Sequence, residues 1–143
     1  MSEVGTGDDR PRPRLLLDTH IVVRLLSDKR KLSREQGRLL EAAVRRVEPL
    51  ALSDISLLEI GILVGEGKLS LNADLGEFFA RLQAHPLLRI LPITCDIAED
   101  IAVLGPLRDP MDRAIVATAR VHTLRLVTSD QRIVESRLVP VVE

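Results

Sequence analysis

The sequence predicts an α/β fold of the three-layer kind, in which helices cover both faces of a central, mostly parallel sheet. Short apolar runs without helical spacing alternate along the chain with segments whose apolar residues recur every three to four positions. Residues that cap helices follow directly after several of these runs. Strands separated by helices in this way are typical of parallel sheets that are buried on both faces.

The first half of the chain begins with a predicted strand. Residues 14–18 form the first apolar run, and residues 21–26 follow with helical spacing. Ser33 is a suitable N-cap for the next helix, which Pro49 ends. Residues 50–52 then predict a second strand.

A third helix is predicted after this strand, because Ser53 or Asp54 can cap it and the glycines of residues 65–67 can end it. A fourth helix at about residues 73–84 precedes another apolar run at residues 87–93. The third helix carries an apolar stripe formed by Ile55, Leu58, Ile62 and Leu63.

The last third of the chain repeats the alternation. Thr94 or Asp96 can open a fifth helix, residues 124–128 predict a strand, residues 131–136 a short helix and residues 138–142 a last apolar segment. A sixth helix is predicted between the fifth helix and the strand at residues 124–128. Asp109 is its N-cap, Pro110 is at the first helical position and Asp112 is an acid at the third.

The length and composition indicate one folded domain. A chain of 143 residues that is 45% hydrophobic and 29% charged can bury a single core and is too apolar for disorder. Residues 1–13 contain glycines and prolines and are predicted to be a flexible tail, and residues 14–143 a single domain. No uninterrupted apolar run reaches about 18 residues, so we expect no membrane span. The single cysteine and the charged start, unlike a signal peptide, favour a cytoplasmic protein.

Charge and motifs exclude several functions. The 20 Lys and Arg residues are balanced by 21 Asp and Glu residues, so any nucleic-acid binding has to be local or assisted by a metal. With only Phe78 and Phe79 as aromatic residues, the stacking surface of many single-strand binders is missing. The sequence also lacks the spacings of zinc sites, serine hydrolases and phosphate-binding glycine-rich loops.

Four acids fall at or shortly after predicted junctions between a strand and a helix. They are Asp18, Glu59, Asp112 and Asp130. Ligand sites in parallel sheets lie beyond the carboxyl ends of the strands, where the following helices begin. Helix capping is a sufficient explanation for any one acid near a helix start, but Glu59 lies too deep in its helix and has no Lys or Arg within four positions. Acids that converge in this way favour Mg²⁺ or Mn²⁺, which take oxygen ligands and support phosphodiester hydrolysis.

Four segments resemble the PIN-domain proteins, and most of all the VapC toxins of bacterial VapBC toxin–antitoxin pairs. They are "LLLDTH", "SDISLLEIGILVGEGKL", "LRDPMDRAIVATA" and "LVTSD", in the order and spacing of that family, and the resemblance extends from about residue 15 to residue 142. It implies a PIN-like fold and an endoribonuclease that acts as the toxin of a type II pair. Departures such as Leu58, where many relatives have Trp, lie beside the acids.

The resemblance also implies roles for particular residues and partners. Asp18, Glu59, Asp112 and Asp130 would be the catalytic acids and would hold one or two Mg²⁺ or Mn²⁺ ions. Thr19 and Thr128 would support the acids with their hydroxyls, and Asp109 would cap a helix or assist the ligands. The expected partners are an RNA substrate, a second copy of the chain in a homodimer, and a small VapB-like antitoxin whose C-terminal segment blocks the active site.

Other functions can be compared with the same positions. A non-catalytic PIN-like module could use this surface to bind RNA or protein. A receiver domain would need adjacent acids after the first strand and a late Lys, but the chain has Asp18-Thr19 and no Lys beyond residue 68. A phosphatase of the haloacid dehalogenase type would need Asp at position 20, which is His20.

Overall fold

Five short strands form a central parallel sheet in the computed structural model, which describes residues 11–143. The spatial order is β4-β3-β2-β5-β6, and every neighbouring pair is parallel. The strands are β2 (Leu15–Leu17), β3 (Leu50–Ser53), β4 (Leu88–Leu91), β5 (Arg125–Val127) and β6 (Val141–Val142). The predicted N-terminal tail, residues 1–13, lies outside the described residues except for its last three.

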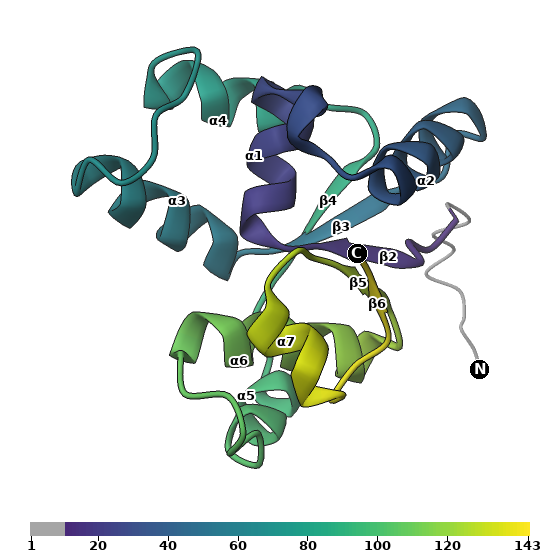
Figure 1. Ribbon diagram of the computed structural model, residues 1–143, viewed down its shortest axis with the longest axis vertical. Coiled ribbons are helices and arrows are strands. Elements are labelled where there is room, and N and C mark those ends of the chain that lie inside the picture. Colours follow the sequence, from purple (N-terminus) through teal and green to yellow (C-terminus); the bar gives the residue numbers. More distant parts are fainter. Residues whose placement is uncertain (1–10) are drawn as a thin grey trace.

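Helices cover both faces of this sheet, so the structure confirms the predicted three-layer fold. Figure 1 shows α1, α2, α3 and α4 on one side of the strands and α5, α6 and α7 on the other. The helices are α1 (Thr19–Ser27), α2 (Arg34–Arg45), α3 (Ile55–Gly65), α4 (Leu75–Ala84), α5 (Cys95–Ile101), α6 (Pro110–His122) and α7 (Gln131–Ser136), and a single 3₁₀ turn, η1 (Lys29–Lys31), follows α1. No helix within residues 11–143 is long and apolar enough to cross a membrane.

The central strand β2 divides the interior into two cores. Successive side chains of a strand point to opposite faces of its sheet. Leu17 accordingly packs with Ile21 of α1 and Phe78 of α4, whereas Leu16 packs with Ile115 of α6. Both leucines are completely buried. Strand β2 is therefore held from both faces, and so is the acid that follows it.

The capping residues act largely as the sequence predicts. Ser33 and Gln36 form a capping box at the start of α2. Asp109 caps α6, with Pro110 in its first turn. At α3, Asp54 occupies the N-cap position without a side-chain bond to the helix, and the Ser53 hydroxyl accepts a hydrogen bond from the backbone N–H of Ile55 instead.

The predicted apolar stripe of α3 is partly wrong. The buried residues of this helix are Ser56 and Ile60, whereas Leu58 and Ile62 are 52% and 40% exposed. Helix α3 is apolar on almost every side, so the spacing of its apolar residues does not select one face. On the inward face, Ile60 packs in the apolar core and the Ser56 hydroxyl lies 2.9 Å from the hydroxyl of Thr19 on α1.

Candidate functional site

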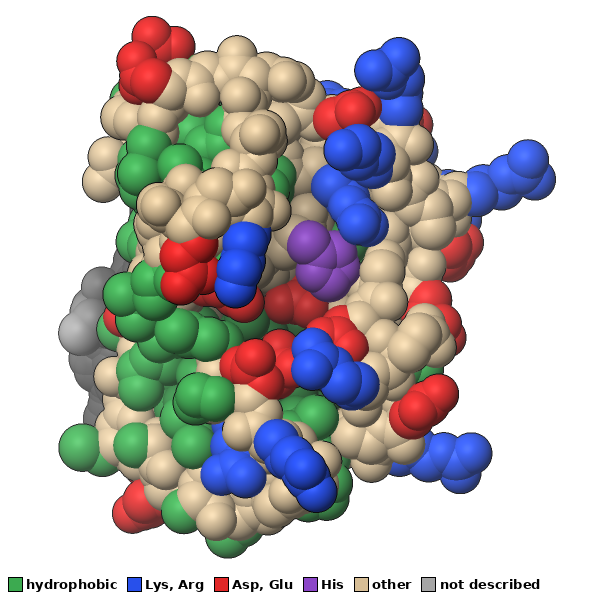
Figure 2. Space-filling view, turned by 60° about the vertical axis from the view of Figure 1, so that its left-hand side comes forward, with side chains coloured by type: hydrophobic (Ala, Val, Ile, Leu, Met, Phe, Trp, Pro, Cys, Tyr) green, Lys and Arg blue, Asp and Glu red, His purple; other side chains and the backbone are tan. Residues whose placement is uncertain are grey.

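One cavity of about 410 Å³ brings together all four acids singled out in the sequence. Asp18, Glu59, Asp112 and Asp130 line it, and Asp109 is a fifth carboxylate. Figure 2 shows acidic side chains gathered in a hollow beside a histidine, with Lys and Arg side chains along its border. Among the described residues, no three His, Cys, Asp or Glu side chains are arranged closely enough to hold a metal ion. The acids thus line one cavity, but in this structure their side chains lie too far apart to coordinate one ion together.

Asp18 is the most firmly held of these acids. Strands β2 and β5 pair so that Leu17 lies opposite Val127, which places the next residues, Asp18 and Thr128, side by side. The Thr128 hydroxyl donates to Asp18 Oδ2 at 2.6 Å, and the backbone N–H of Thr19 donates to Asp18 Oδ1 at 2.8 Å. Asp18 is therefore the cap of α1 and also a wall of the cavity.

Asp112 lies in the first turn of α6. Asp109 Oδ1 accepts hydrogen bonds from the backbone N–H groups of Met111 at 2.8 Å and Asp112 at 3.3 Å, which fixes the start of the helix. Burial, together with the nearby carboxylates of Asp109, Asp130 and Asp18, raises the pKa of Asp112 to about 7, and the charge of Arg132 opposes this rise. Its ionised form is consequently unfavourable unless a cation lies nearby.

Glu59 reaches the cavity from the second turn of α3, where it is half-buried. Burial raises the pKa of Glu59, the hydroxyl of Thr19 opposes that rise, and the carboxylates of Asp18, Asp109 and Asp130 add to it. Glu59 does not cap α3, because Asp54 occupies the N-cap position and Glu59 lies one turn further on. Its environment also favours a neighbouring cation.

Asp130 caps α7 and is paired with Arg132, a residue that the sequence argument missed. The two guanidinium nitrogens Nε and Nη2 of Arg132 lie 3.3 and 3.1 Å from the oxygens of Asp130, and Nη2 lies 3.6 Å from Asp112 Oδ2. Burial alone would raise the pKa of Asp130, but these bonds from Arg132 hold it below its ordinary value. A cation two residues after a predicted N-cap acid is the sequence signal that could have pointed to this pair.

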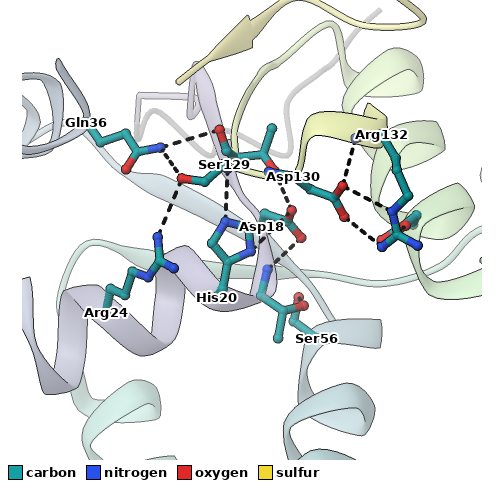
Figure 3. Close-up of polar contacts among 11 residues, drawn as sticks. Asp18, His20, Arg24, Gln36, Ser56, Ser129, Asp130 and Arg132 are labelled. Atoms are coloured by element: carbon teal, nitrogen blue, oxygen red, sulfur yellow. Dashed lines mark hydrogen bonds and ion pairs between the residues drawn. The ribbon is translucent and has the colours of Figure 1, made fainter. Parts of the chain in front are cut away.

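A polar network holds the segment that carries Asp130 (Figure 3). The backbone N–H of Ser129 donates to His20 Nε2 at 3.0 Å, and the amide of Gln36 donates to Ser129 Oγ at 3.0 Å. Arg24 Nη1 reaches the same hydroxyl at 3.5 Å. Gln36 of α2 is completely buried and lies 93 positions from Ser129 in the sequence, and nothing in its local pattern predicts this contact.

His20 is neutral in this arrangement. Burial lowers the pKa of His20, the carboxylate of Asp18 opposes this, and the charge of Arg24 lowers it further. Because Nε2 accepts a hydrogen bond, the proton of the neutral ring is on Nδ1, which lies 3.6 Å from Asp18 Oδ2. His20 therefore faces the acids without adding a full positive charge.

The donor set suits a hard divalent cation. The groups around the cavity are carboxylates and hydroxyls, and Arg132 shows that two of the carboxylates attract a cation in this structure. Zinc sites are built mainly from His and Cys ligands, whereas His20 lines this cavity among carboxylates and the exposed Cys95 does not line it. The residues present thus fit Mg²⁺ or Mn²⁺ in chemistry, although their side chains would have to draw together to hold either ion.

Comparisons with known proteins agree with the fold. The family model "PIN domain" matches residues 15–137. The chain is 31% identical over 121 residues to "Ribonuclease VapC22" of Mycobacterium tuberculosis (strain ATCC 25618 / H37Rv), covering 83% of this chain and 88% of that protein.

Two solved structures extend this likeness. A toxin–antitoxin complex from Klebsiella pneumoniae contains a chain that is 28% identical, with a TM-score of 0.61 and coverage of 90% of this chain and 96% of that one. The VapBC2 structure from Rickettsia felis, bound to a DNA fragment from its promoter, is 17% identical with a TM-score of 0.66 and the same coverage, and it is similar in fold.

Proposed function

This chain belongs to the PIN domain family, and from that premise we propose that it is a metal-dependent endoribonuclease, the toxin of a type II toxin–antitoxin pair. The observation that carries the proposal is the cavity in which Asp18, Glu59, Asp112 and Asp130 meet, in a chain similar to a VapC ribonuclease. The cytoplasm, where RNA is the substrate at hand, is the proposed place of action.

The four acids are the proposed ligands of Mg²⁺ or Mn²⁺. A bound ion of this kind would supply an activated water and would neutralise charge on the RNA phosphate. The chain's own contribution is to hold the ligands in place: Thr128 and the Thr19 backbone fix both oxygens of Asp18, and Asp109 fixes the turn that carries Asp112. Raised pKa values at Glu59 and Asp112 support a cation in this position, because an adjacent positive charge favours the ionised acids.

An antitoxin and a second copy of the chain are the proposed protein partners. The solved structures with similar chains include toxin–antitoxin complexes, which supports a small antitoxin for this chain. Its C-terminal segment is proposed to block the cavity, as the family resemblance implies. The homodimer rests on the same resemblance.

The chemistry is tested with purified protein and RNA, with Mg²⁺ or Mn²⁺ and with EDTA. We expect cleavage only with the metal, and a loss on the order of 100-fold or more in Asp18→Asn and Asp112→Asn. Asp96→Asn is the matched control, because Asp96 is exposed on α5 and does not line the cavity. The inactive variants, purified identically, reveal contaminating ribonuclease. Cleavage by Asp18→Asn at the wild-type rate would contradict the proposal.

A second candidate is a non-catalytic module that binds RNA or protein at the same cavity. The pairing of Arg132 with Asp112 and Asp130 favours it, because that cation lies against two of the proposed ligands. Metal binding by the purified chain, with no cleavage across a broad panel of RNAs, would select this function over the nuclease.

A further inference from the structure

The cavity continues past the acids to an end with the opposite charge. Arg24 and Ser27 of α1, Lys31 of η1 and Asn72 after α3 line this part. We call the pair Arg24 and Lys31 the basic end. Figure 3 shows Arg24 rising from α1 toward Ser129, the residue next to Asp130.

The cations around the cavity differ in whether a carboxylate already binds them. Arg132 is paired with Asp130 and Asp112. Within residues 11–143, by contrast, neither Arg24 nor Lys31 has a carboxylate oxygen within the 4.0 Å of an ion pair. The basic end therefore keeps its positive charge available to a ligand.

Hydrogen bonds to neighbouring polar groups take up little of that charge, and Lys31 acts on Asp28 only through the longer-range attraction that helps to lower the Asp28 pKa. The carboxylate at this end, Asp28, accepts hydrogen bonds from the side chain and the backbone N–H of Arg30, both at 3.2 Å. The contact from Arg24 to Ser129 Oγ is long, at 3.5 Å, and that hydroxyl already accepts from Gln36 at 3.0 Å. Most of the five N–H donors of the Arg24 guanidinium are thus free of recorded partners among the described residues.

The geometry points to a phosphate subsite. We propose that Arg24 and Lys31 bind a backbone phosphate of single-stranded RNA next to the phosphate that lies at the acids. This inference rests on the proposed nuclease function. Single-stranded RNA carries a phosphate at every nucleotide, so a strand with one phosphate at the acids has another nearby. A guanidinium matches the geometry of a phosphate, and an ammonium adds a second positive charge.

The subsite would also offset a repulsion that the acids create. Six carboxylates line the cavity, Asp28 among them, and the chain as a whole has a net charge of −1, so no general positive field attracts RNA. Binding through Arg24 and Lys31 is independent of base sequence, because phosphate contacts carry no sequence information.

The test measures binding of a fluorescein-labelled single-stranded RNA of about 20 mixed nucleotides by anisotropy in EDTA, over a series of salt concentrations. We expect Arg24→Gln to weaken binding about three- to tenfold and to lower the slope of log affinity against log salt by about 0.7. The double variant Arg24→Gln with Lys31→Gln should lower this slope by about 1.4 relative to the wild type. Arg46→Gln, which removes an equal charge from an exposed site away from the cavity, should change neither value.

A purely structural role for Arg24 predicts a different result. If the residue only holds Ser129, Arg24→Gln lowers the melting temperature and leaves the salt slope unchanged, which overturns the subsite. An equal effect of Arg46→Gln also overturns it. If the wild type cleaves RNA in Mn²⁺, and Arg24→Gln has the same Kd and KM for RNA as the wild type, the subsite is contradicted and the proposed nuclease function is not. Wild-type protein that neither binds nor cleaves RNA contradicts both the subsite and the proposed function.

Discussion

Replacing Asp112 with Asn should make the metal-free protein more stable at alkaline pH. Asp112 is only 8% exposed, and the ionised carboxylate lies among other acids. The rise of its pKa from 3.8 to about 7 corresponds to about 4 kcal/mol of unfavourable free energy for the ionised form. Asn has nearly the same shape and no charge, so it removes this term.

One smaller effect opposes the gain, because Asn loses the attraction of an acid for the start of α6, which is worth about 0.3–1 kcal/mol. Asn also loses the pair with Arg132 at 3.6 Å, but the pKa of about 7 already includes the attraction of Arg132, so this loss is not subtracted again. We therefore expect Asp112→Asn to raise the free energy of unfolding by about 3–4 kcal/mol at pH 8.

The pH dependence gives this expectation a definite sign. Between about pH 4 and pH 7 the folded protein holds a proton on Asp112 that the unfolded chain has released, so wild-type stability falls as pH rises through this window. Near pH 4 the group is neutral in the folded protein and only about half ionised in the unfolded chain, so the advantage of the variant should shrink below about 1 kcal/mol.

Urea denaturation in EDTA at pH 8 and near pH 4, followed by circular dichroism, measures both values. Asp96→Asn, on the exposed side of α5, controls for a general change of charge. If Asp112→Asn is neutral or destabilising at pH 8 without metal, Asp112 does not carry the electrostatic cost that its burial and neighbouring acids imply.

Three further predictions concern the residues around the acids. Thr128→Val removes the 2.6 Å hydrogen bond to Asp18. It should lower the free energy of unfolding, measured by urea denaturation, by about 1–3 kcal/mol, and it should lower the rate of RNA cleavage about tenfold. Gln36→Ala removes a fully buried amide and its bond to Ser129, and it should cost about 2 kcal/mol in the same assay. Arg132→Gln frees two carboxylates from a competing cation and should tighten Mn²⁺ binding about fivefold in titration calorimetry.

Each of these predictions has an outcome that contradicts it. Unchanged stability of Thr128→Val would show that the hydroxyl does not hold the acid. Gln131→Ala is the control for Gln36→Ala, because Gln131 is exposed. If both variants lose the same free energy of unfolding, the buried hydrogen bond of Gln36 does not stabilise the fold. Weaker Mn²⁺ binding by Arg132→Gln than by Arg46→Gln would mean that Arg132 assists the ion.

Much of the fold could be predicted because single residues carry strong local signals. The leucines of β2 are apolar without helical spacing, and Asp109 with Pro110 meets the rules for a helix start, so both elements were expected close to their observed bounds. The inward face of α3 could not be predicted, because Ile60 and Leu58 are equally apolar and only packing against α1 separates them.

The acids of the site were predictable for a related reason, and their counter-charges were not. Asp18, Asp112 and Asp130 lie at helix starts, a position that the chain reveals locally. Glu59 could be singled out because it is an acid within an apolar helical segment that has no Lys or Arg nearby in the sequence. The contact of Gln36 with Ser129 joins residues 93 positions apart, and the orientation of Arg132 toward Asp112 depends on how α6 and α7 pack. Such pairings arise from tertiary structure, and no local pattern encodes them.

The brevity of β2 limits which insertions and deletions the chain can tolerate. The strand has three residues, and adjacent side chains serve different cores. If one residue were added to or deleted from β2 before Asp18, and β2 still paired with β5, Leu16 and Leu17 would exchange between the two faces of the sheet. The acid would move with them, away from Thr128. We expect homologous chains to vary in length within their loops and to keep the count from Leu15 to Asp18 constant.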